Sequence, residues 1–480
     1  GQEPPDADLA ADARRAGRGA AGLKAASDLL DVGLQVDLIE ARDRLGGRAF
    51  TDTSLRVPID LGCQWLHDAP DNPWVVEAKR LKIKTFKQVK DDFYFDPADL
   101  SVARSKECRK RVESLEGQIE SALTNDHTDS AAANAVTSAK LASSDPWYPV
   151  AEARVAGLEE SAELSEFSAI DHHAEDVELP YKFETSNSDR SNYLPSGGYG
   201  ALIKKYGEDL IERHGNKGTK RLSVFLARQV TQVHRASNAL TVKSQKVSGG
   251  SALQFKPRAV LLAVPTSIIA AQKLKFVPPL PLATARAFAK LPLGHFKKVA
   301  LQFTHDIFSV ESYATKLSLE KLEELRKTFP KVQKDDEVWP LPPSGTKHTW
   351  KFVSNLHGKN VVVGFVGGAL AKQLEQESDN AVIQHALDRL TTTLGPVLGP
   401  HVKGMYAKRA VVSRWDTDPW SLGAYSYTAP GGKGARSHLY QQPMSDELIF
   451  FAGEALWQNS YGTAHGAYYT AAAMLEALGY

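Results

Sequence analysis

Three glycines near the start of the chain, Gly17, Gly19 and Gly22, have the spacing G-x-G-x-x-G within AGRGAAG. In a strand–turn–helix unit the first glycine allows the turn, the second lets a diphosphate approach the backbone, and the third lets helix pack on strand. Glu40 closes the next apolar run, where its carboxylate can accept hydrogen bonds from ribose hydroxyls. The pattern predicts a dinucleotide site, with a plain glycine-rich helix start as the alternative.

A second stretch, EARDRLGGR, begins at Glu40 and combines the types of residue that bind phosphate. Arg42 and Arg48 carry guanidinium groups that can donate paired hydrogen bonds to a phosphate. Gly46 and Gly47 permit close approach of the backbone. A basic surface turn is the alternative, but the position directly after Glu40 favours the second half of a dinucleotide pocket.

The elements that must position these residues alternate between strands and helices, which predicts an α/β fold. The segment before the glycines, DADLAADARRA, is more polar than a buried parallel strand usually is, and its strand is therefore expected to be short. Helices are predicted within 16–33, 102–166, 194–210, 317–329, 380–395 and 462–478, strands within 35–41, 239–245, 252–265, 360–368 and 447–455, and a proline-rich loop over 335–348.

The composition excludes several classes of protein. The 58 basic and 57 acidic residues give a net charge of +1, which gives no reason to expect a nucleic-acid or anionic-membrane partner. The sequence has no apolar run long enough for a membrane span. Two cysteines cannot form a disulfide framework or a four-thiolate metal site. The first residues show no signal peptide, and a soluble, cytoplasmic protein is the default expectation, with the compartment left open.

Several motifs together resemble the flavin-dependent amine oxidases, which include polyamine oxidases, monoamine oxidases and histone-lysine demethylases. The resemblance starts with GRGAAGL and LIEARDRLGGR and continues through DLGCQWLHDAPDNPW and LPLGHFKKVALQF. It ends with RWDTDPWSLGAYSYTAPG (414–431) and FAGEALWQNSYGTAHGAY (451–468). The resemblance implies a Rossmann-like FAD-binding domain and a second, substrate-binding domain of mixed sheet plus helices.

Carried over position by position, the resemblance implies a set of FAD-binding residues. Glu40 would bind the adenosine ribose, Arg42 and Arg48 would lie near the diphosphate, and the start of the last helix would lie beside the flavin ring. Ala424 stands where monoamine oxidases of the outer mitochondrial membrane carry a flavin-linked cysteine, which implies non-covalent FAD. The implied set is Gly17, Gly19, Gly22, Glu40, Arg42, Gly47, Arg48, Leu61, Gly62, Cys63, Gln64, Val230, Trp415, Glu454, Thr463 and Ala464.

The resemblance also implies catalytic residues. Lys298 stands where the family has a lysine that reaches the flavin through a water, with Lys297 as the neighbouring alternative because strand alternation lets only one face the site. Tyr425 would flank the substrate amine, and Trp420 would wall the cavity. Trp65 and His67 are candidates for substrate contact, although His67 could equally be structural.

Two further positions bear on the kind of amine. Thr463 stands where monoamine oxidases have a second tyrosine, which leaves a two-tyrosine cage in doubt and favours polyamine-oxidase-like members.

No metal site is predicted, because the residues of DHHAEDVE (171–178) match no ligand spacing. The acidic stretch could attract a polycation, with a solvated loop as the default.

The resemblance implies a discontinuous FAD-binding domain over 1–75, 194–272 and 400–480, and a substrate-binding domain over 76–193 and 273–399. The expected reaction is oxidation of an amine, by hydride transfer from its α-carbon to flavin N5, to an imine and then an aldehyde, with O2 reduced to H2O2. Alternatives are an L-amino-acid oxidase, which would need a cavity arginine such as Arg286 or Arg190, and a catalytically silent flavin-binding scaffold. Expected partners are a small amine and O2; the oligomeric state stays open.

Overall fold

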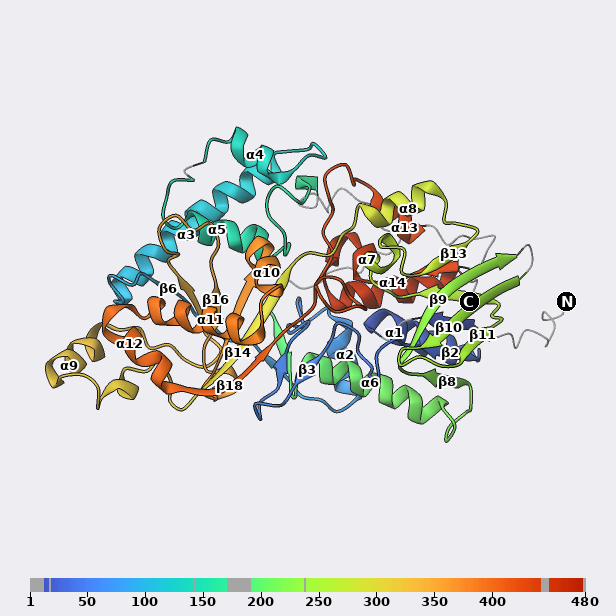
Figure 1. The fold of residues 1–480 in the computed structure, drawn as a ribbon, viewed down its shortest axis with the longest axis horizontal. Coiled ribbons are helices and arrows are strands. Elements are labelled where there is room, and N and C mark those ends of the chain that lie inside the picture. The colour runs from blue at the N-terminus through green and yellow to red at the C-terminus, as the bar shows by residue number, and fades with distance from the viewer. Residues whose placement is uncertain are drawn as a thin grey trace.

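The computed structural model describes residues 13–16, 19–141, 143–170, 191–236, 239–441 and 449–477. Two lobes lie side by side in Figure 1. One contains a five-stranded parallel sheet in the order β19-β12-β1-β2-β8. Its strands are β1 (Ala13–Ala16), β2 (Val36–Ile39), β8 (Leu222–Phe225), β12 (Ala259–Leu262) and β19 (Ile449–Phe451). The expected strand before the glycines is therefore present; it is only four residues long and lies in the centre of the sheet.

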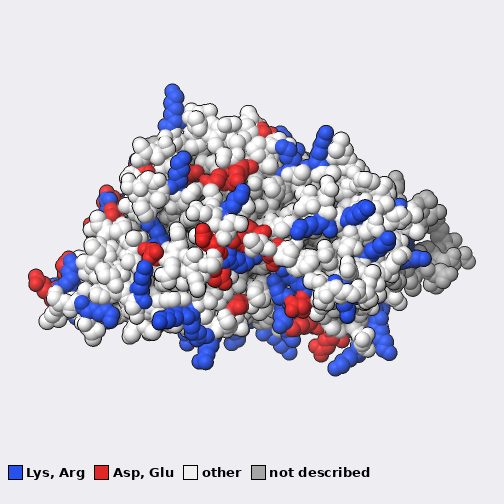
Figure 2. Space-filling model, in the orientation of Figure 1, with Lys and Arg blue, Asp and Glu red and all other residues white. Residues whose placement is uncertain are grey.

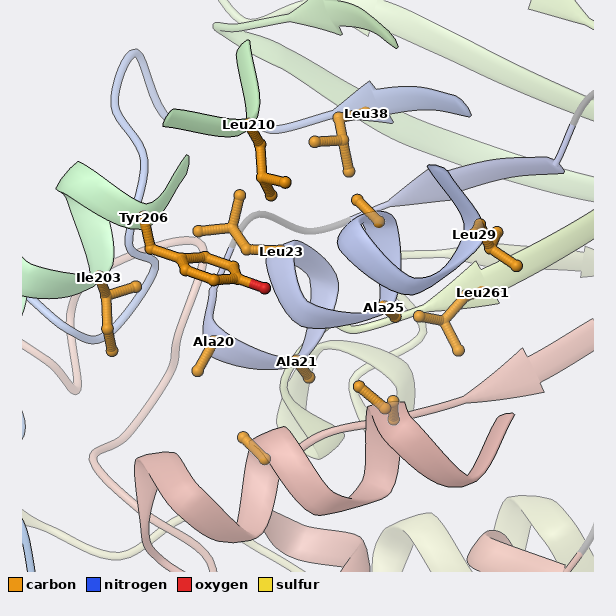
Figure 3. Close-up of a cluster of buried hydrophobic side chains, with 14 of the residues drawn as sticks. Ala20, Ala21, Leu23, Ala25, Leu29, Leu38, Ile203, Tyr206, Leu210 and Leu261 are labelled. Atoms are coloured by element: carbon orange, nitrogen blue, oxygen red, sulfur yellow. The ribbon is translucent and has the colours of Figure 1, made fainter. Parts of the chain in front are cut away.

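Alternate side chains of the parallel sheet face two different layers, as the two-residue period of a strand requires. Leu38, Leu261 and Phe450 pack against α1 (Ala20–Asp31), α6 (Tyr199–His214) and α14 (Ala464–Ala477). Figure 3 shows part of this cluster, with the small side chains of Ala20, Ala21 and Ala25 on α1. These small residues let the last helix of the chain pack closely beside the first, so that the starts of both helices reach the same cavity.

The opposite face of the parallel sheet is covered by a second layer. This layer holds a four-stranded sheet, β11-β10-β9-β13, together with the short helices α7, α8 and α13. The bounds are β9 Arg228–Ala236, β10 Ala239–Lys246, β11 Ala252–Phe255, β13 Lys275–Val277, α7 Thr266–Ala270, α8 Leu282–Ala289 and α13 Ala435–Gln441. The predicted strand region 252–265 thus divides into β11 and β12, which belong to different sheets.

The other lobe contains a six-stranded sheet in the order β18-β14-β17-β16-β15-β6, in which only the β15–β6 pair is parallel. Val299 and Leu301 face a layer of helices, whereas Lys298 and Ala300 face the first lobe. The strands are β6 Asp92–Phe95, β14 Phe296–Phe303, β15 Glu337–Pro340, β16 Lys351–Val353, β17 Val361–Gly367 and β18 Tyr406–Val412; the helices are α10 Gly368–Glu375, α11 Asp379–Thr393 and α12 Gly395–Met405.

The remaining elements complete the two lobes. A helical block of α3, α4, α5 and a π-helix turn packs beside β6 and confirms the predicted helical region within 102–166. The bounds are α2 Pro73–Arg80, α3 Val102–Thr124, α4 Ala132–Ser138, α5 Tyr148–Glu152, π-helix Ala153–Gly157, α9 Leu319–Thr328, β3 Thr51–Asp52, β4 Ile59–Asp60, β5 Thr85–Lys87 and β7 Tyr193–Pro195.

One predicted element was wrong. The stretch 335–348 was expected to be a proline-rich loop, but its residues Glu337–Pro340 form β15, and all four are buried. Pro340 is tolerated because it ends the strand, where its missing N–H breaks no ladder hydrogen bond. β15 pairs on both sides, with β6 and β16, so its strand conformation is imposed by neighbours distant in sequence.

The described residues contain no helix that is both long and apolar enough to cross a membrane. On the face drawn in Figure 2, basic and acidic side chains are interspersed, without a continuous field of one sign. Within the same described part of the chain, no group of three or more His, Cys, Asp or Glu side chains is arranged to hold a metal ion.

The contact between Gly367 and Gly157 yields a test of the fold. A Cβ on Gly367, at the end of β17, would lie 1.5 Å from the carbonyl oxygen of Gly157. We therefore expect Gly367→Ala to destabilise the protein by about 1–3 kcal/mol, because backbone must move to admit the methyl group. Thermal unfolding of the purified protein measures this change.

Gly117→Ala is the matched control, because Gly117 is exposed in the middle of α3 and a Cβ there meets nothing within 4 Å. Alanine is the better helix former, so this variant should gain about 0.5–1 kcal/mol. Equal thermal midpoints for the two variants would contradict the close approach of β17 to the π-helix.

Candidate active site

A cavity of about 580 Å³ lies where the two lobes meet, a volume typical of small-molecule sites. It is lined by residues from the parallel sheet, from the six-stranded sheet and from the C-terminal segments. A larger depression of about 880 Å³ beside α3 and α4 is lined mostly by small polar side chains and has Asp126 as its single ionisable residue. The ionisable groups that can do chemistry therefore gather in the smaller cavity.

One side of the cavity, which we call the glycine wall, consists of Gly19, Glu40, Gly46 and Gly47. The two predicted halves of the dinucleotide pocket meet here, since a Cβ on Gly47 would lie 3.1 Å from the Cα of Gly19. Gly46 and Gly47 have φ of +99° and +58°, values that favour glycine. Helix α1 begins directly behind this contact, and no side chain caps its N-cap residue Gly19.

The two predicted phosphate-binding arginines line the cavity, but both already bind protein oxygens. Arg42 donates to Asp418 at 2.5 Å and to Ser421 Oγ at 2.8 Å. Arg48 donates to the carbonyl oxygen of Ala424 at 2.6 Å. It also forms an ion pair with Glu454, at 2.8 Å.

Glu454 is buried and ionised. Burial alone would raise the pKa of this carboxyl, but Arg48, Ser426 and Arg436 together lower it. Its Oε2 accepts hydrogen bonds from Ser426 Oγ and from the N–H of Gly462, both at 2.8 Å. The preceding residue, Gly453, has φ +154°, and a Cβ there would meet nothing within 4 Å, so its backbone is open to the cavity.

Lys298 points into the cavity, and this settles which of the paired lysines faces the site. Its ammonium donates to the carbonyl oxygens of Asp60 and Gly62, both at 2.8 Å, and to Gln64 Oε1 at 3.1 Å. Burial and, to a smaller extent, the neighbouring charge of Lys351 lower the pKa of Lys298 to about 8, although the nearby Asp60 carboxylate acts in the opposite direction. Lys297 points to the opposite face of β14, where it pairs with Glu375.

Lys298 is one member of a row of cations and aromatic rings that crosses the six-stranded sheet. Phe365 of β17 lies between Lys298 of β14 and Lys351 of β16 in the strand register. The two ammonium groups lie 5.1 and 4.8 Å from its ring, within range of cation–π attraction. Trp65 stacks on Phe365 and lies 5.5 Å from Lys298 and 5.0 Å from Lys351.

Lys351 is held at the far side of this row by Glu337, at 3.1 Å, which also binds Lys90 at 2.8 Å. Burial lowers the pKa of Lys351, while Glu337 raises it. Lys351 and its partner Glu337 carry no recognisable sequence signal, because they lie in and just after the stretch 335–348, which was expected to be a loop.

A second side of the cavity, which we call the tyrosine wall, consists of Tyr425, Tyr461, Phe296 and the turn Leu158–Glu160. The hydroxyl of Tyr425 donates to the carbonyl oxygen of Leu158 at 2.5 Å, and that of Tyr461 donates to Glu160 Oε1 at 2.6 Å. Burial raises the pKa of Tyr425 well above its usual value, and Glu159 and Glu160 raise it further, so the phenol stays neutral.

Glu159 has a free carboxylate on the tyrosine wall. No donor among the described residues forms a hydrogen bond or ion pair with it. The residue lines the cavity with an exposed side chain, and desolvation raises the pKa of its carboxyl, although Lys351 and Arg154 act in the opposite direction. An unpaired carboxylate beside aromatic rings is suited to binding a cation.

The cavity brings together nearly all the residues predicted from the sequence. Gly17 lies outside the described residues, as do His172 and His173, and Gly22 is buried in α1 rather than on the cavity surface. The residues on the cavity surface are Gly19, Glu40, Arg42, Gly47, Arg48, Leu61, Gly62, Cys63, Gln64, Trp65, His67, Val230, Lys298, Trp415, Trp420, Tyr425, Glu454, Thr463 and Ala464.

Three of these residues have bonds that bear on their expected roles. Thr463 caps α14, since its hydroxyl accepts from Gly466 N–H at 2.9 Å. Trp415 donates its indole N–H to the carbonyl oxygen of Leu61 at 2.8 Å. His67 contacts Asn192 through Nδ1 at 3.0 Å, and burial lowers its pKa, which favours the neutral ring. Glu159, Glu160 and Tyr461 were missed; the only sequence signal was a pair of adjacent acids after an apolar turn.

Comparison with known proteins gives one consistent result. The family described as flavin containing amine oxidoreductase matches residues 20–474. Probable polyamine oxidase 4 of Arabidopsis thaliana is 27% identical over 474 residues, covering 94% of this chain and 84% of its own. Polyamine oxidase 2 of the same plant is 28% identical over 465 residues, covering 95% and 85%. A putrescine oxidase structure with bound putrescine is 20% identical, with a TM-score of 0.70 over 97% of this chain and 99% of its own, which shows a shared fold.

The lowered pKa of Lys298 can be tested on the folded protein. We expect the Lys298 ammonium to titrate near pH 8. We expect Lys351→Met to move its midpoint to higher pH, because a neighbouring positive charge is removed. The ¹³Cε chemical shifts of labelled lysines, followed from about pH 6 to about pH 11, measure both midpoints, and Lys298→Arg assigns the resonance.

Lys359→Met is the control, since Lys359 is exposed on the same lobe. A Lys298 midpoint that is equal in the Lys351→Met and Lys359→Met proteins would show that the row of cations has no influence on the site.

Proposed function

The chain belongs to the family of flavin-containing amine oxidoreductases and is an FAD-dependent enzyme, as the sequence motifs predicted, and we propose that it oxidises amines with a second cationic nitrogen, such as polyamines. The observation that carries the proposal is the carboxylate of Glu159 beside the aromatic rings of the tyrosine wall, which no donor in the described part of the chain binds. A single amine needs no such group. A diamine or polyamine brings a distant ammonium that can pair with it.

The residues of the glycine wall fit FAD. The close contact of Gly19 with Gly47 leaves backbone facing the cavity, and the uncapped start of α1 offers N–H groups to a diphosphate. In this proposal Glu40 would bind the ribose, and Gly453 and Glu454, which line the same cavity, would hold the part of FAD between the phosphates and the ring. Ala424 at the position of the family's flavin-linked cysteine supports non-covalent binding.

When bound, FAD would supply the redox chemistry, taking up the hydride lost from the α-carbon of the amine and passing the electrons to O2 to give H2O2. The chain's own residues orient the amine and exclude water. Tyr425, Phe296 and Trp420 present apolar rings, which favour an uncharged amine at the reacting nitrogen. Glu159 fixes the distant nitrogen, so that the reacting carbon is held in one place.

Lys298 is proposed to move a proton during the step with oxygen. Its three acceptors are all uncharged, and its pKa of about 8 lets it exchange a proton near neutral pH. The start of α14 at Ala464, capped by Thr463, is proposed to stabilise negative charge at the pyrimidine end of the ring through its dipole.

The division into domains is a further part of the proposal. The parallel sheet with its covering layers would be the FAD-binding domain, and the six-stranded sheet with its helices the substrate-binding domain. Because β18 pairs with β14 in the six-stranded sheet, we place the start of the last FAD-binding segment after residue 412 rather than at 400.

The alternative of an L-amino-acid oxidase gains no support from the cavity. Arg286 lies on α8, outside the cavity lining, and Arg190 lies outside the described residues. Arg42 and Arg48 bind carboxylates of the protein already. Production of H2O2 from any amine in a panel of spermidine, putrescine, tyramine and lysine would exclude a flavin-binding scaffold without turnover.

Glu159→Gln tests the substrate class. We expect kcat/KM for spermidine to fall about 10- to 100-fold, since a charge-assisted contact of roughly 1.5–3 kcal/mol is lost. The value for tyramine, which has one amine, should change little. In the wild-type protein the preference for spermidine should decline as the pH falls, because the raised pKa of Glu159 neutralises this carboxylate earlier than an ordinary one.

Glu113→Gln, on the exposed side of α3, controls for the loss of one negative charge. An equal loss of activity toward spermidine and tyramine in the Glu159→Gln protein would refute the polyamine assignment and leave a monoamine oxidase.

Lys298→Met tests the role of the lysine. We expect the reaction of the reduced enzyme with O2 to slow by about 10- to 100-fold, a typical contribution of one proton-transfer group, with a smaller effect on reduction by the amine. Stopped-flow absorbance separates the two half-reactions, with Lys359→Met as the control. Unchanged rates in both half-reactions would remove Lys298 from the mechanism.

A further inference from the structure

Tyr461 lies on the tyrosine wall and is fixed at both ends of its side chain. Its hydroxyl donates to Glu160 Oε1 at 2.6 Å. Its ring lies 3.9 Å from the guanidinium of Arg436, which is a strong cation–π distance. Arg436 is itself 1% exposed and donates to Ser426 Oγ and to the carbonyl oxygen of Ala455, both at 2.8 Å. The ring of Tyr461 is therefore held in one orientation.

The side chains of Tyr461 and Tyr425 both extend from the region of Gly462 to the turn Leu158–Glu160. At one end, Gly462 packs on Tyr425, since a Cβ there would lie 3.3 Å from Tyr425 Cδ2. At the other end, both hydroxyls reach the turn Leu158–Glu160, one at the carbonyl oxygen of Leu158 and one at the carboxylate of Glu160. Two rings that share both ends must line adjacent parts of one wall.

We propose that Tyr461 is a specificity-determining residue that supplies the second aromatic surface of the amine site; the inference rests on the proposed function. Thr463 stands at the position of the second tyrosine in monoamine oxidases, and here its hydroxyl caps α14 instead. The aromatic surface is instead supplied by Tyr461, which lies two positions before Thr463 in the same segment.

The hydrogen bond between Tyr461 and Glu160 also distinguishes the two adjacent acidic residues, Glu159 and Glu160. Glu160 is engaged by the Tyr461 hydroxyl and is 3% exposed, whereas Glu159 faces the cavity without a donor among the described residues. Tyr461 thus holds one carboxylate in the protein and leaves the other for the ligand. A cation bound at Glu159 would lie close to an electron-rich ring, which adds to the attraction.

The test measures binding of a diamine that cannot react. In 2,5-dimethylhexane-2,5-diamine both carbons next to nitrogen lack hydrogen, so no hydride can leave, and the affinity for the holoenzyme can be measured by titration calorimetry. We expect Tyr461→Leu to weaken binding about tenfold, which corresponds to the loss of one partly desolvated cation–π contact. Tyr461→Phe keeps the ring and should show a smaller loss.

Tyr440→Phe is the matched control, because the buried Tyr440 hydroxyl has no hydrogen-bond partner among the residues that the structure describes and lies outside the cavity lining. Flavin content and thermal midpoint are measured for every variant, and Tyr461→Met, which fills the volume without a ring, replaces the leucine variant if that protein loses flavin.

Wild-type affinity in the Tyr461→Leu protein, or an equal loss in the Tyr440→Phe protein, overturns the inference. Failure of the proposed function has a different signature: the wild-type protein then produces no H2O2 from spermidine, putrescine or tyramine. A wild-type protein that oxidises spermidine but does not bind the unreactive diamine also overturns the role given to Tyr461.

Discussion

The cavity depends on one largely buried ion pair, between Arg48 and Glu454. Through it, three segments that are far apart in the sequence are fixed to one another: Arg48 also binds the carbonyl oxygen of Ala424, and Glu454 accepts from Ser426 and from the N–H of Gly462. Removing one partner of such a pair leaves an uncompensated buried charge, which costs about 3–5 kcal/mol. The positions of Tyr425, of Gly453 and of the start of α14 all follow from this single contact.

The charges around the cavity differ in how far the protein has compensated them. Arg42 and Arg48 are neutralised by carboxylates, whereas Lys298 has only uncharged acceptors and Glu159 has no donor among the described residues. Burial moves the pKa of each of the latter two toward the neutral form, lower for Lys298 and higher for Glu159. Groups that are shifted in this way within a pocket are the ones expected to act on a ligand.

The sequence was informative where chemistry restricts local backbone, and uninformative where distant strands decide the structure. Gly46 and Gly47 of LGGR, and Gly462 just before the last helix, identified their own positions because their backbone has positive φ, which favours glycine. By contrast, β15 and the row from Lys298 through Phe365 to Lys351 exist only because of cross-strand register, which no local pattern encodes. Glu159 was missed for the same reason, because its position in the cavity, with no donor among the described residues, exists only in the folded chain.

The two arginines expected near the diphosphate also have a structural role within the protein. Arg42 and Arg48 were expected to donate to phosphate, and both lie on the cavity surface, but their guanidinium groups are committed to Asp418 and Glu454. The start of helix α1 is suited to add backbone donors for a diphosphate, because Gly19 carries no side-chain cap and the first turn contains no acidic residue. The ion pairs of the two arginines fix the loops that surround this helix start, so that side-chain and backbone donors lie on one cavity surface.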